Sequence, residues 1–207
     1  RGLVGSEMCI RDRSRSEMRS SMKIGILAVQ GAFAEHEQML EQLGAEYIEL
    51  RKGEDVRQSY DGLILPGGES TVQGKLMREL DMFDTIQSQI KNGMPVLATC
   101  AGAILLAQQL SNDAATHLAT LPAVVRRNAY GRQLGSFSVD EQIEGIGTFP
   151  MRFIRAPYIE KVLDDTKVLA KVNGNIVMVE NKNQLAMSFH PELTSDTRIH
   201  EMFLKKI

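Results

Sequence analysis

The chain has 207 residues, of which 43% are hydrophobic and 24% charged, a composition typical of a globular protein with one compact core. Its net charge of -2 excludes the general positive field that attracts nucleic acids or anionic membranes. No apolar run approaches the roughly 20 residues that a membrane helix needs. Two cysteines are too few for a disulfide framework, which favours the cytoplasm and leaves a thiol free for chemistry.

The segment before Met22 differs from the rest of the chain. It is rich in Arg and Ser, shows no clear hydrophobic period and lacks the apolar stretch of a secretory signal. It resembles translated cloning or sequencing sequence. We therefore interpret residues 1–21 as a non-native, disordered leader in which Cys9 has no function. Residues 22–207 are expected to form a single domain, because no repeat or composition break divides them.

Beyond the leader, short apolar runs alternate with segments of helical period. Apolar residues from Phe33 to Leu43, with His36 among them, recur at the spacing of one helix face. Ser70 follows a turn and is placed to cap a helix. In this half we expect strands over residues 24–29, 47–50, 63–65 and 96–99, and helices over 33–43, from 70 onward, and over 82–91 and 104–110.

The second half is richer in short strands. Asn173-Gly174-Asn175 is typical of the tight turn of a hairpin. Strands interleaved with helices indicate an α/β fold whose central sheet is mostly parallel and covered on both faces, with antiparallel additions in this half. The strands are expected over residues 124–125, 136–139, 149–154, 167–172, 176–180 and 185–189, and a last helix over 197–205.

Cys100 lies where a strand is expected to end and a helix to begin. The run Ala98-Thr99-Cys100-Ala101-Gly102 fits a nucleophile elbow, a sharp turn that presents one side chain above the sheet. The positive end of the helix favours a thiolate there. A buried, inert thiol is the common alternative for a single cysteine, and the elbow alone does not decide between the two.

The run His190-Pro191-Glu192 strengthens the catalytic interpretation. Residues two apart at the end of a strand point to the same side, so His190 and Glu192 are expected to face one cleft. A carboxylate beside an imidazole fixes its tautomer and stabilises its charged form. Cys100, His190 and Glu192 can thus form a triad, and the alternative is a structural histidine beside a solvated glutamate.

The turn Pro66-Gly67-Gly68-Glu69-Ser70 follows a buried strand. Its glycines can expose backbone N–H groups to an oxyanion, so the N–H groups of Gly68 and Ala101 are the candidate donors. A tight turn leading into a helix is the simpler explanation of the same residues.

Together these motifs resemble the class I, or triad, glutamine amidotransferases. Within them, the match is close to the glutaminase subunits of pyridoxal 5'-phosphate synthase and spans nearly everything after Met22. The triad motifs are shared across amidotransferases. The runs RNAYGRQ (127–133) and FIRAP (153–157) are much more specific to these subunits. The matching runs are LAVQG at 27–31, PGGEST at 66–71, TCAG at 99–102, RNAYGRQ at 127–133, FIRAP at 153–157 and FHPEL at 189–193.

The resemblance implies a three-layer, flavodoxin-like fold and a role for each matching residue. Cys100 would attack the side-chain amide of glutamine, His190 would transfer a proton to the departing ammonia, and Glu192 would orient His190. The set offers a carboxylate and cations, which a zwitterionic substrate needs. The residues that would hold glutamine are Gly68, Glu69, Ser70, Arg127, Ile154 and Arg155.

One position departs from the family pattern. The family usually has glycine two residues before the nucleophile, where this chain has Ala98. A single methyl group is expected to leave the elbow intact if the backbone there has a negative φ angle. We expect no metal and no cofactor, because the four histidines form no ligand-spaced cluster with cysteines and no GxGxxG or GxxxxGK loop occurs.

The resemblance also implies a partner. This is the barrel-shaped synthase subunit, which consumes the ammonia within a large hetero-oligomer and without which the glutaminase is largely inactive. Three alternatives stay open: a glutaminase of another synthase, such as that of histidine biosynthesis; a cysteine hydrolase or stress protein of the same fold; and a non-catalytic subunit. The first is not expected to carry RNAYGRQ or FIRAP, the second lacks a late His-Pro-Glu run, and intact Cys100, His190 and Glu192 argue against the third.

Overall fold

The computed structural model describes residues 21–127 and 135–207. Nearly all of the expected leader, and the RNAYGRQ run apart from Arg127, therefore lie outside the described residues. Within the described ranges no helix is both long and apolar enough to cross a membrane. The same residues contain no group of three or more His, Cys, Asp or Glu side chains that could hold a metal ion.

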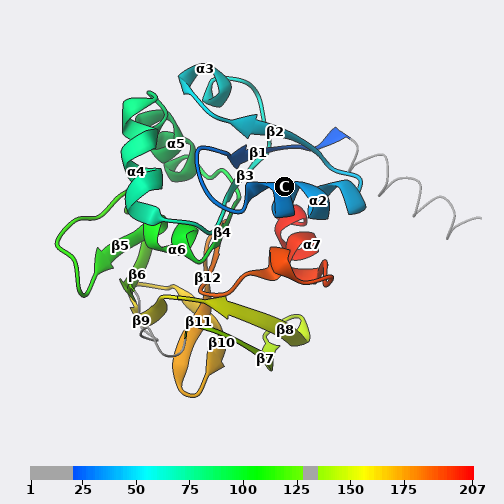
Figure 1. Cartoon of the computed structure of the whole chain (residues 1–207), viewed down its shortest axis with the longest axis vertical. Coiled ribbons are helices and arrows are strands. Elements are labelled where there is room, and N and C mark those ends of the chain that lie inside the picture. The colour runs from blue at the N-terminus through cyan, green and yellow to red at the C-terminus, as the bar shows by residue number, and fades with distance from the viewer. Residues whose placement is uncertain (1–20, 128–134) are drawn as a thin grey trace, which may run out of the picture.

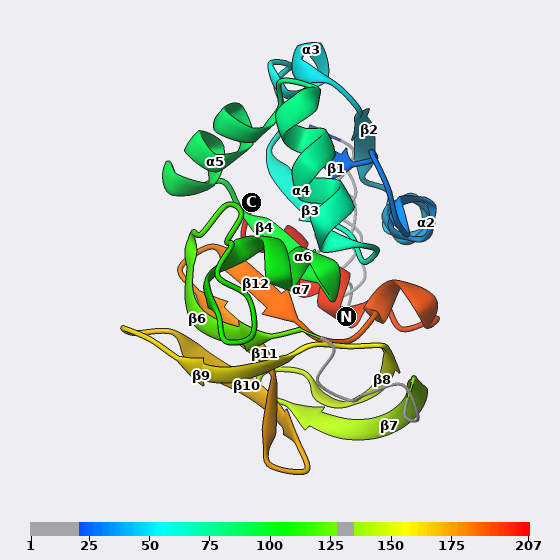
Figure 2. The same cartoon turned by 60° about the vertical axis from the view of Figure 1, so that its left-hand side comes forward.

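The described residues form a curled sheet with helices on both faces (Figures 1 and 2). The helices are α2 (Phe33–Gln42), α3 (Gly53–Val56), α4 (Ser70–Glu79), α5 (Phe83–Lys91), α6 (Ala101–Leu106), the 3-10 helix η1 (Pro191–Leu193) and α7 (Arg198–Leu204). The strands are β1 (Lys23–Leu27), β2 (Glu46–Leu50), β3 (Gly62–Leu65), β4 (Val96–Thr99), β5 (Ala107–Leu110), β6 (Leu121–Arg126), β7 (Ser136–Ile143), β8 (Gly147–Ile154), β9 (Tyr158–Val162), β10 (Lys167–Val172), β11 (Asn175–Asn181) and β12 (Gln184–Met187).

The strand order in the main sheet is β2-β1-β3-β4-β12-β11-β9-β6-β5, with β10 paired to β11. The strands from β2 to β12 in this order are parallel, whereas β11 pairs antiparallel with β12, β10 and β9. The expected α/β fold with antiparallel strands in the second half is confirmed. Because β1, β3, β4 and β12 are parallel neighbours, the loops at their carboxyl ends meet at one edge, where open α/β sheets bind ligands.

Alternate residues of the central strands enter two separate apolar cores. Leu63 and Leu65 of β3 pack on the side of α4, α5 and α6, and Ile64 between them packs on the side of α2 and α7. This follows from the two-residue period of a strand. Burial on both faces explains why these strands appear in the sequence as continuous apolar runs.

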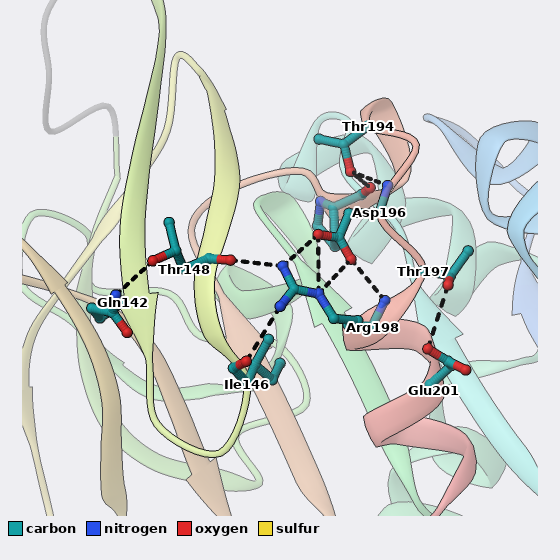
Figure 3. A network of polar contacts seen from close by, with 9 residues as sticks. Gln142, Ile146, Thr148, Thr194, Asp196, Thr197, Arg198 and Glu201 are labelled. Atoms are coloured by element: carbon teal, nitrogen blue, oxygen red, sulfur yellow. Dashed lines mark hydrogen bonds and ion pairs between the residues drawn. The ribbon is translucent and has the colours of Figure 1, made fainter.

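The β7–β8 hairpin forms a separate sheet that is fastened to the start of α7 by Arg198 (Figure 3). The Arg198 guanidinium donates to the Asp196 carboxylate from Nε and Nη2, at 3.0 and 2.7 Å. It also donates to the carbonyls of Ile146 and Thr148, at 3.3 and 2.6 Å. These contacts tie the hairpin to the segment that follows η1.

Some local predictions were wrong. The helix expected over 104–110 ends at Leu106, and the next four residues form β5 because they pair in parallel with β6. Ser70 is the first residue of α4, and Glu69 occupies the N-cap position. β1 ends at Leu27 rather than at residue 29, and α3 and β9 were not predicted. The hairpin turn after β10 is present, with φ angles of 49° at Asn173 and 82° at Gly174.

Candidate active site

Cys100 lies on the turn from β4 into α6. Its backbone has a φ of 49° and a ψ of -105°, a conformation that costs a residue with a side chain about 1–3 kcal/mol. The turn is held because the Cys100 N–H donates to the carbonyl of Met187 at 2.8 Å, and the Cys100 carbonyl accepts from Ala103 at 3.0 Å. This is the strained strand-to-helix turn that a nucleophile elbow requires.

Small residues allow this turn to fit. A Cβ atom at Gly102 would collide with the backbone carbonyl of Leu65, so α6 lies against β3 only because residue 102 is glycine. Ala98 is buried in β4 and is not among the residues with positive φ. Ala98 therefore has no positive φ angle, which is the condition under which an alanine fits here, and its methyl group causes no backbone conflict.

His190 and Glu192 lie in contact beside the elbow. The His190 Nδ1 atom is 2.5 Å from Glu192 Oε1, and both side chains are buried. The strand argument for this contact was wrong, because β12 ends at Met187 and Glu192 belongs to the 3-10 helix η1. The backbone of His190 is fixed separately, since its N–H donates to the carbonyl of Arg152 in β8 at 2.8 Å.

The surroundings of His190 keep its ring charged. Burial lowers its pKa, but hydrogen bonds to Cys100 and Glu192, together with their negative charges, raise the pKa to about 10. His190 therefore carries a proton at neutral pH. An imidazolium beside a cysteine favours the nucleophilic thiolate.

A cavity of about 520 Å³ lies over the elbow. The sequence-predicted residues that line it are Gly68, Glu69, Ser70, Cys100, Ala101, Arg127, Ile154, Arg155 and His190. Glu192 is the exception among the predicted residues, because it lies in contact with His190 and does not line the cavity. The structure thus gathers into one place residues that are widely separated along the chain.

The turn after β3 is anchored by two glutamines that the sequence analysis did not single out. The Glu69 N–H donates to Gln30 Oε1 at 2.8 Å. The Gln73 amide donates to the carbonyls of Gln30 and Pro66, each at 3.1 Å. Gln30 lies in the matching run LAVQG, and Gln73 is a fully buried amide one turn into α4. Neither residue's place in the sequence predicts its hydrogen bonds to this turn, because those bonds depend on the fold.

Arg127, Ile154 and Arg155 line the cavity on the side of β6 and β8. Arg127 donates to Asp113 Oδ2 at 2.9 Å and to Thr71 Oγ1 at 3.1 Å, so its guanidinium is held in place. The Ile154 carbonyl is 3.9 Å from Cys100 Sγ. Arg155, the next residue, has a positive φ of 43°. The cavity therefore has cations on one wall and the carboxylate of Glu69 in the turn after β3.

Comparison with known proteins identifies the family. Residues 26–207 match the SNO glutamine amidotransferase family. The chain belongs to this family. The resemblance to the glutamine amidotransferases and the activity expected from it are thereby confirmed.

Relatives of the SNO family agree closely with this chain. It is 63% identical over 186 residues to pyridoxal 5'-phosphate synthase subunit PdxT of Desulfitobacterium hafniense, covering 90% of this chain and 94% of that protein. It is 53% identical over 186 residues to pyridoxal 5'-phosphate synthase subunit PdxT of Streptococcus pneumoniae, covering 88% and 96%.

Solved structures agree with the fold. A crystal structure described as a glutamine amidotransferase has a TM-score of 0.84 and 43% identity, covering 88% of this chain and 97% of that one. A glutamine amidotransferase from Thermotoga maritima has a TM-score of 0.61 and 16% identity, covering 89% and 83%, and supports the fold alone.

Proposed function

We propose that this SNO-family chain hydrolyses glutamine with a Cys100, His190 and Glu192 triad and passes the ammonia to a pyridoxal 5'-phosphate synthase subunit. The observation that carries the proposal is that Cys100 and His190 line the same cavity, while Glu192 Oε1 lies 2.5 Å from His190 Nδ1. The names of the relatives, which are subunits of that synthase, support the destination of the ammonia.

The chemistry follows from the elbow. Cys100 Sγ attacks the amide carbon of glutamine, and the resulting oxyanion accepts hydrogen bonds from the N–H groups of Gly68 and Ala101. Ala101 is the first residue of α6, so its N–H has no partner within the helix. His190 protonates the leaving nitrogen, the C–N bond breaks and a γ-glutamyl thioester remains. Water, deprotonated by His190, then releases glutamate and restores the thiolate.

The walls of the cavity suit the ends of the substrate. The Glu69 carboxylate pairs with the ammonium of glutamine, and Arg127 or Arg155 pairs with its carboxylate. Gly68, Ser70 and Ile154 complete the lining. A volume of about 520 Å³ lies in the range typical of small-molecule sites.

The proposal extends to assembly and location. Ammonia that escapes into water becomes ammonium, so the glutaminase is useful only when docked on the enzyme that consumes ammonia. We assign it to a hetero-oligomer with the barrel-shaped synthase subunit in the cytoplasm. We also assign residues 22–207 to a single amidotransferase domain.

Covalent labelling tests the nucleophile. When the synthase partner is present, a chloroketone analogue of glutamine should add one equivalent to Cys100, detected by peptide mass spectrometry, and excess glutamine should slow the labelling. The matched control is the analogue one methylene shorter, which should label more slowly because its carbonyl falls short of Sγ. Labelling that is indifferent to glutamine and to analogue length would contradict the proposal and favour a non-catalytic subunit.

A further inference from the structure

Glu192 has a second set of polar neighbours on the side away from His190. His36 of α2 lies with Nε2 3.6 Å from Glu192 Oε2 and 3.3 Å from Thr99 Oγ1. Its other ring nitrogen, Nδ1, is 2.9 Å from His200 Nε2 in α7. His36, Thr99 and His200 are fully buried, so this cluster lies in the core rather than at the surface.

Such a cluster is unfavourable to bury. Polar groups cost free energy in an apolar core unless hydrogen bonds replace those to water, and apolar side chains would pack there without that cost. Among the described residues, Glu192 Oε2 is buried without a hydrogen-bond partner at normal distance. The group that faces this oxygen is His36 Nε2. Packing alone therefore does not account for a histidine at position 36.

Both histidines of the cluster are neutral. Burial, and then electrostatic repulsion from the protonated forms of His200 and His190, lower the pKa of His36 well below its ordinary value. Burial lowers the pKa of His200 to about 4. Each ring therefore has one nitrogen that donates a hydrogen bond and one that accepts.

Only one arrangement of these protons suits the surroundings. With a proton on Nε2, His36 donates a hydrogen bond to Thr99 Oγ1, presents the positive end of the same N–H dipole to Glu192 Oε2 at 3.6 Å, and accepts at Nδ1 from His200 Nε2. The reverse arrangement places a lone pair of His36 against the Glu192 carboxylate and leaves the buried His200 Nδ1 with an N–H and no acceptor. A buried N–H without a partner is rarer in proteins than an unpaired acceptor, so the first arrangement is favoured.

We propose that His36 is a positioning residue of the triad, whose Nε2–H holds Glu192 Oε2 so that Oε1 stays on His190, while His200 fixes the tautomer of His36. The inference rests on the proposed function, because it gives Glu192 a second support for the same task. Glu192 belongs to a three-residue 3-10 helix, and its side chain has several rotatable bonds. Contacts to both carboxylate oxygens restrict those torsions.

The test follows the proton on His190, which a purely structural role for His36 would not change. The ionisable groups around the Glu192 carboxylate are His190 from the start of η1, His36 from α2, His200 from α7 behind His36, and Cys100 beyond His190. In the full chain, nuclear magnetic resonance of the His190 ring should give a pKa of about 10. We expect His36→Phe, which cannot donate, to lower that pKa by about one unit or more.

The conservative variant His36→Gln distinguishes the loss of the hydrogen-bond donor from a change in side-chain size. His36→Gln keeps an N–H at about the position of Nε2, and we expect it to restore most of the His190 pKa. Glutamine hydrolysis with the synthase subunit should fall about tenfold in kcat for His36→Phe with little change in KM, as for other groups that support a catalytic residue. His36→Asn, whose amide is too short to reach Glu192, should lower the His190 pKa as well and serves if the Phe variant does not fold.

Leu40→Ala is the matched control for lost stability. Leu40 is buried in the same helix and the same core, one turn from His36, and does not belong to the site. The variant should have a lower unfolding temperature and an unchanged His190 titration. An unchanged His190 pKa in both His36→Phe and His36→Asn would overturn the inference. Wild-type protein that fails to hydrolyse glutamine with the synthase would instead remove the proposed function, whatever the titration shows.

Discussion

The charge of the His190 ring depends on two neighbours that are separated in the chain, Cys100 and Glu192. Glu192→Gln keeps the size of the side chain and removes its charge, so we expect the pKa of His190 to fall from about 10 toward its ordinary value. Glutamine hydrolysis should fall by about 10²- to 10⁴-fold in kcat, the usual effect of disturbing a general acid and base. Steady-state kinetics with the synthase subunit measures this.

Glu79→Gln is the control for that change. Glu79 forms an exposed pair with Lys75 one turn away in α4, and such pairs contribute about 0.5 kcal/mol. The control variant should keep wild-type kinetics. If Glu192→Gln behaved in the same way, Glu192 would not orient His190.

His200 makes folding sensitive to acid. Its pKa is about 4 in the folded chain and near 6.5 when unfolded, so between these values the unfolded chain binds more protons. The free energy of unfolding therefore decreases as pH falls from about 6.5 to 4. Between pH 7 and pH 5 this group contributes a loss of about 2 kcal/mol. Urea unfolding of wild type and His200→Leu at both pH values tests this, since the variant should lose less; equal losses would contradict it.

At the scale of elements, β4 accommodates Ala98 at the position where the family resemblance led us to expect glycine. Ala98→Gly should leave glutamine hydrolysis unchanged, because Ala98 has no positive φ and lies in an ordinary strand. It should reduce the free energy of unfolding by about 1 kcal/mol, since glycine weakens a strand interior. Kinetics together with urea unfolding checks both. A variant several times more active would mean that the methyl group does strain the elbow.

The elements that could be predicted are those whose pattern is local. β4 and β10 coincide with their predicted ranges. The segment Ala107–Leu110 was assigned to a helix because Ala107 and Leu110 continue the apolar helical spacing of α6. It is a strand because it pairs in parallel with β6, the next strand along the chain. Patterns within a segment carry no information on such pairing.

The site was predictable to the extent that its residues occupy recognisable runs at the ends of strands. Cys100 and the turn at Gly68 follow their strands directly. The contacts of Gln73 and His36 could not be derived, since they depend on how α4 and α2 lie against loops from elsewhere. One signal was present for His36, because it is a polar residue on the apolar face of α2.

At the scale of the whole molecule, the site depends on the order of the strands. β1, β3, β4 and β12 are neighbours in the sheet, although β12 follows β4 in the chain only after seven other strands. His190 therefore reaches Cys100 only when the second half of the chain has returned to the centre of the sheet. Ile154, the last residue of β8, lines this cavity as well.

The most direct test measures glutamate release from glutamine by residues 22–207, with and without the pyridoxal 5'-phosphate synthase subunit. Cys100→Ala serves as the matched control, because it removes the sulfur and keeps the small elbow residue. We expect activity that disappears in the variant and that requires the synthase partner. Equal activity without the synthase would contradict this conditional activity, and activity that survives in Cys100→Ala would contradict the triad itself.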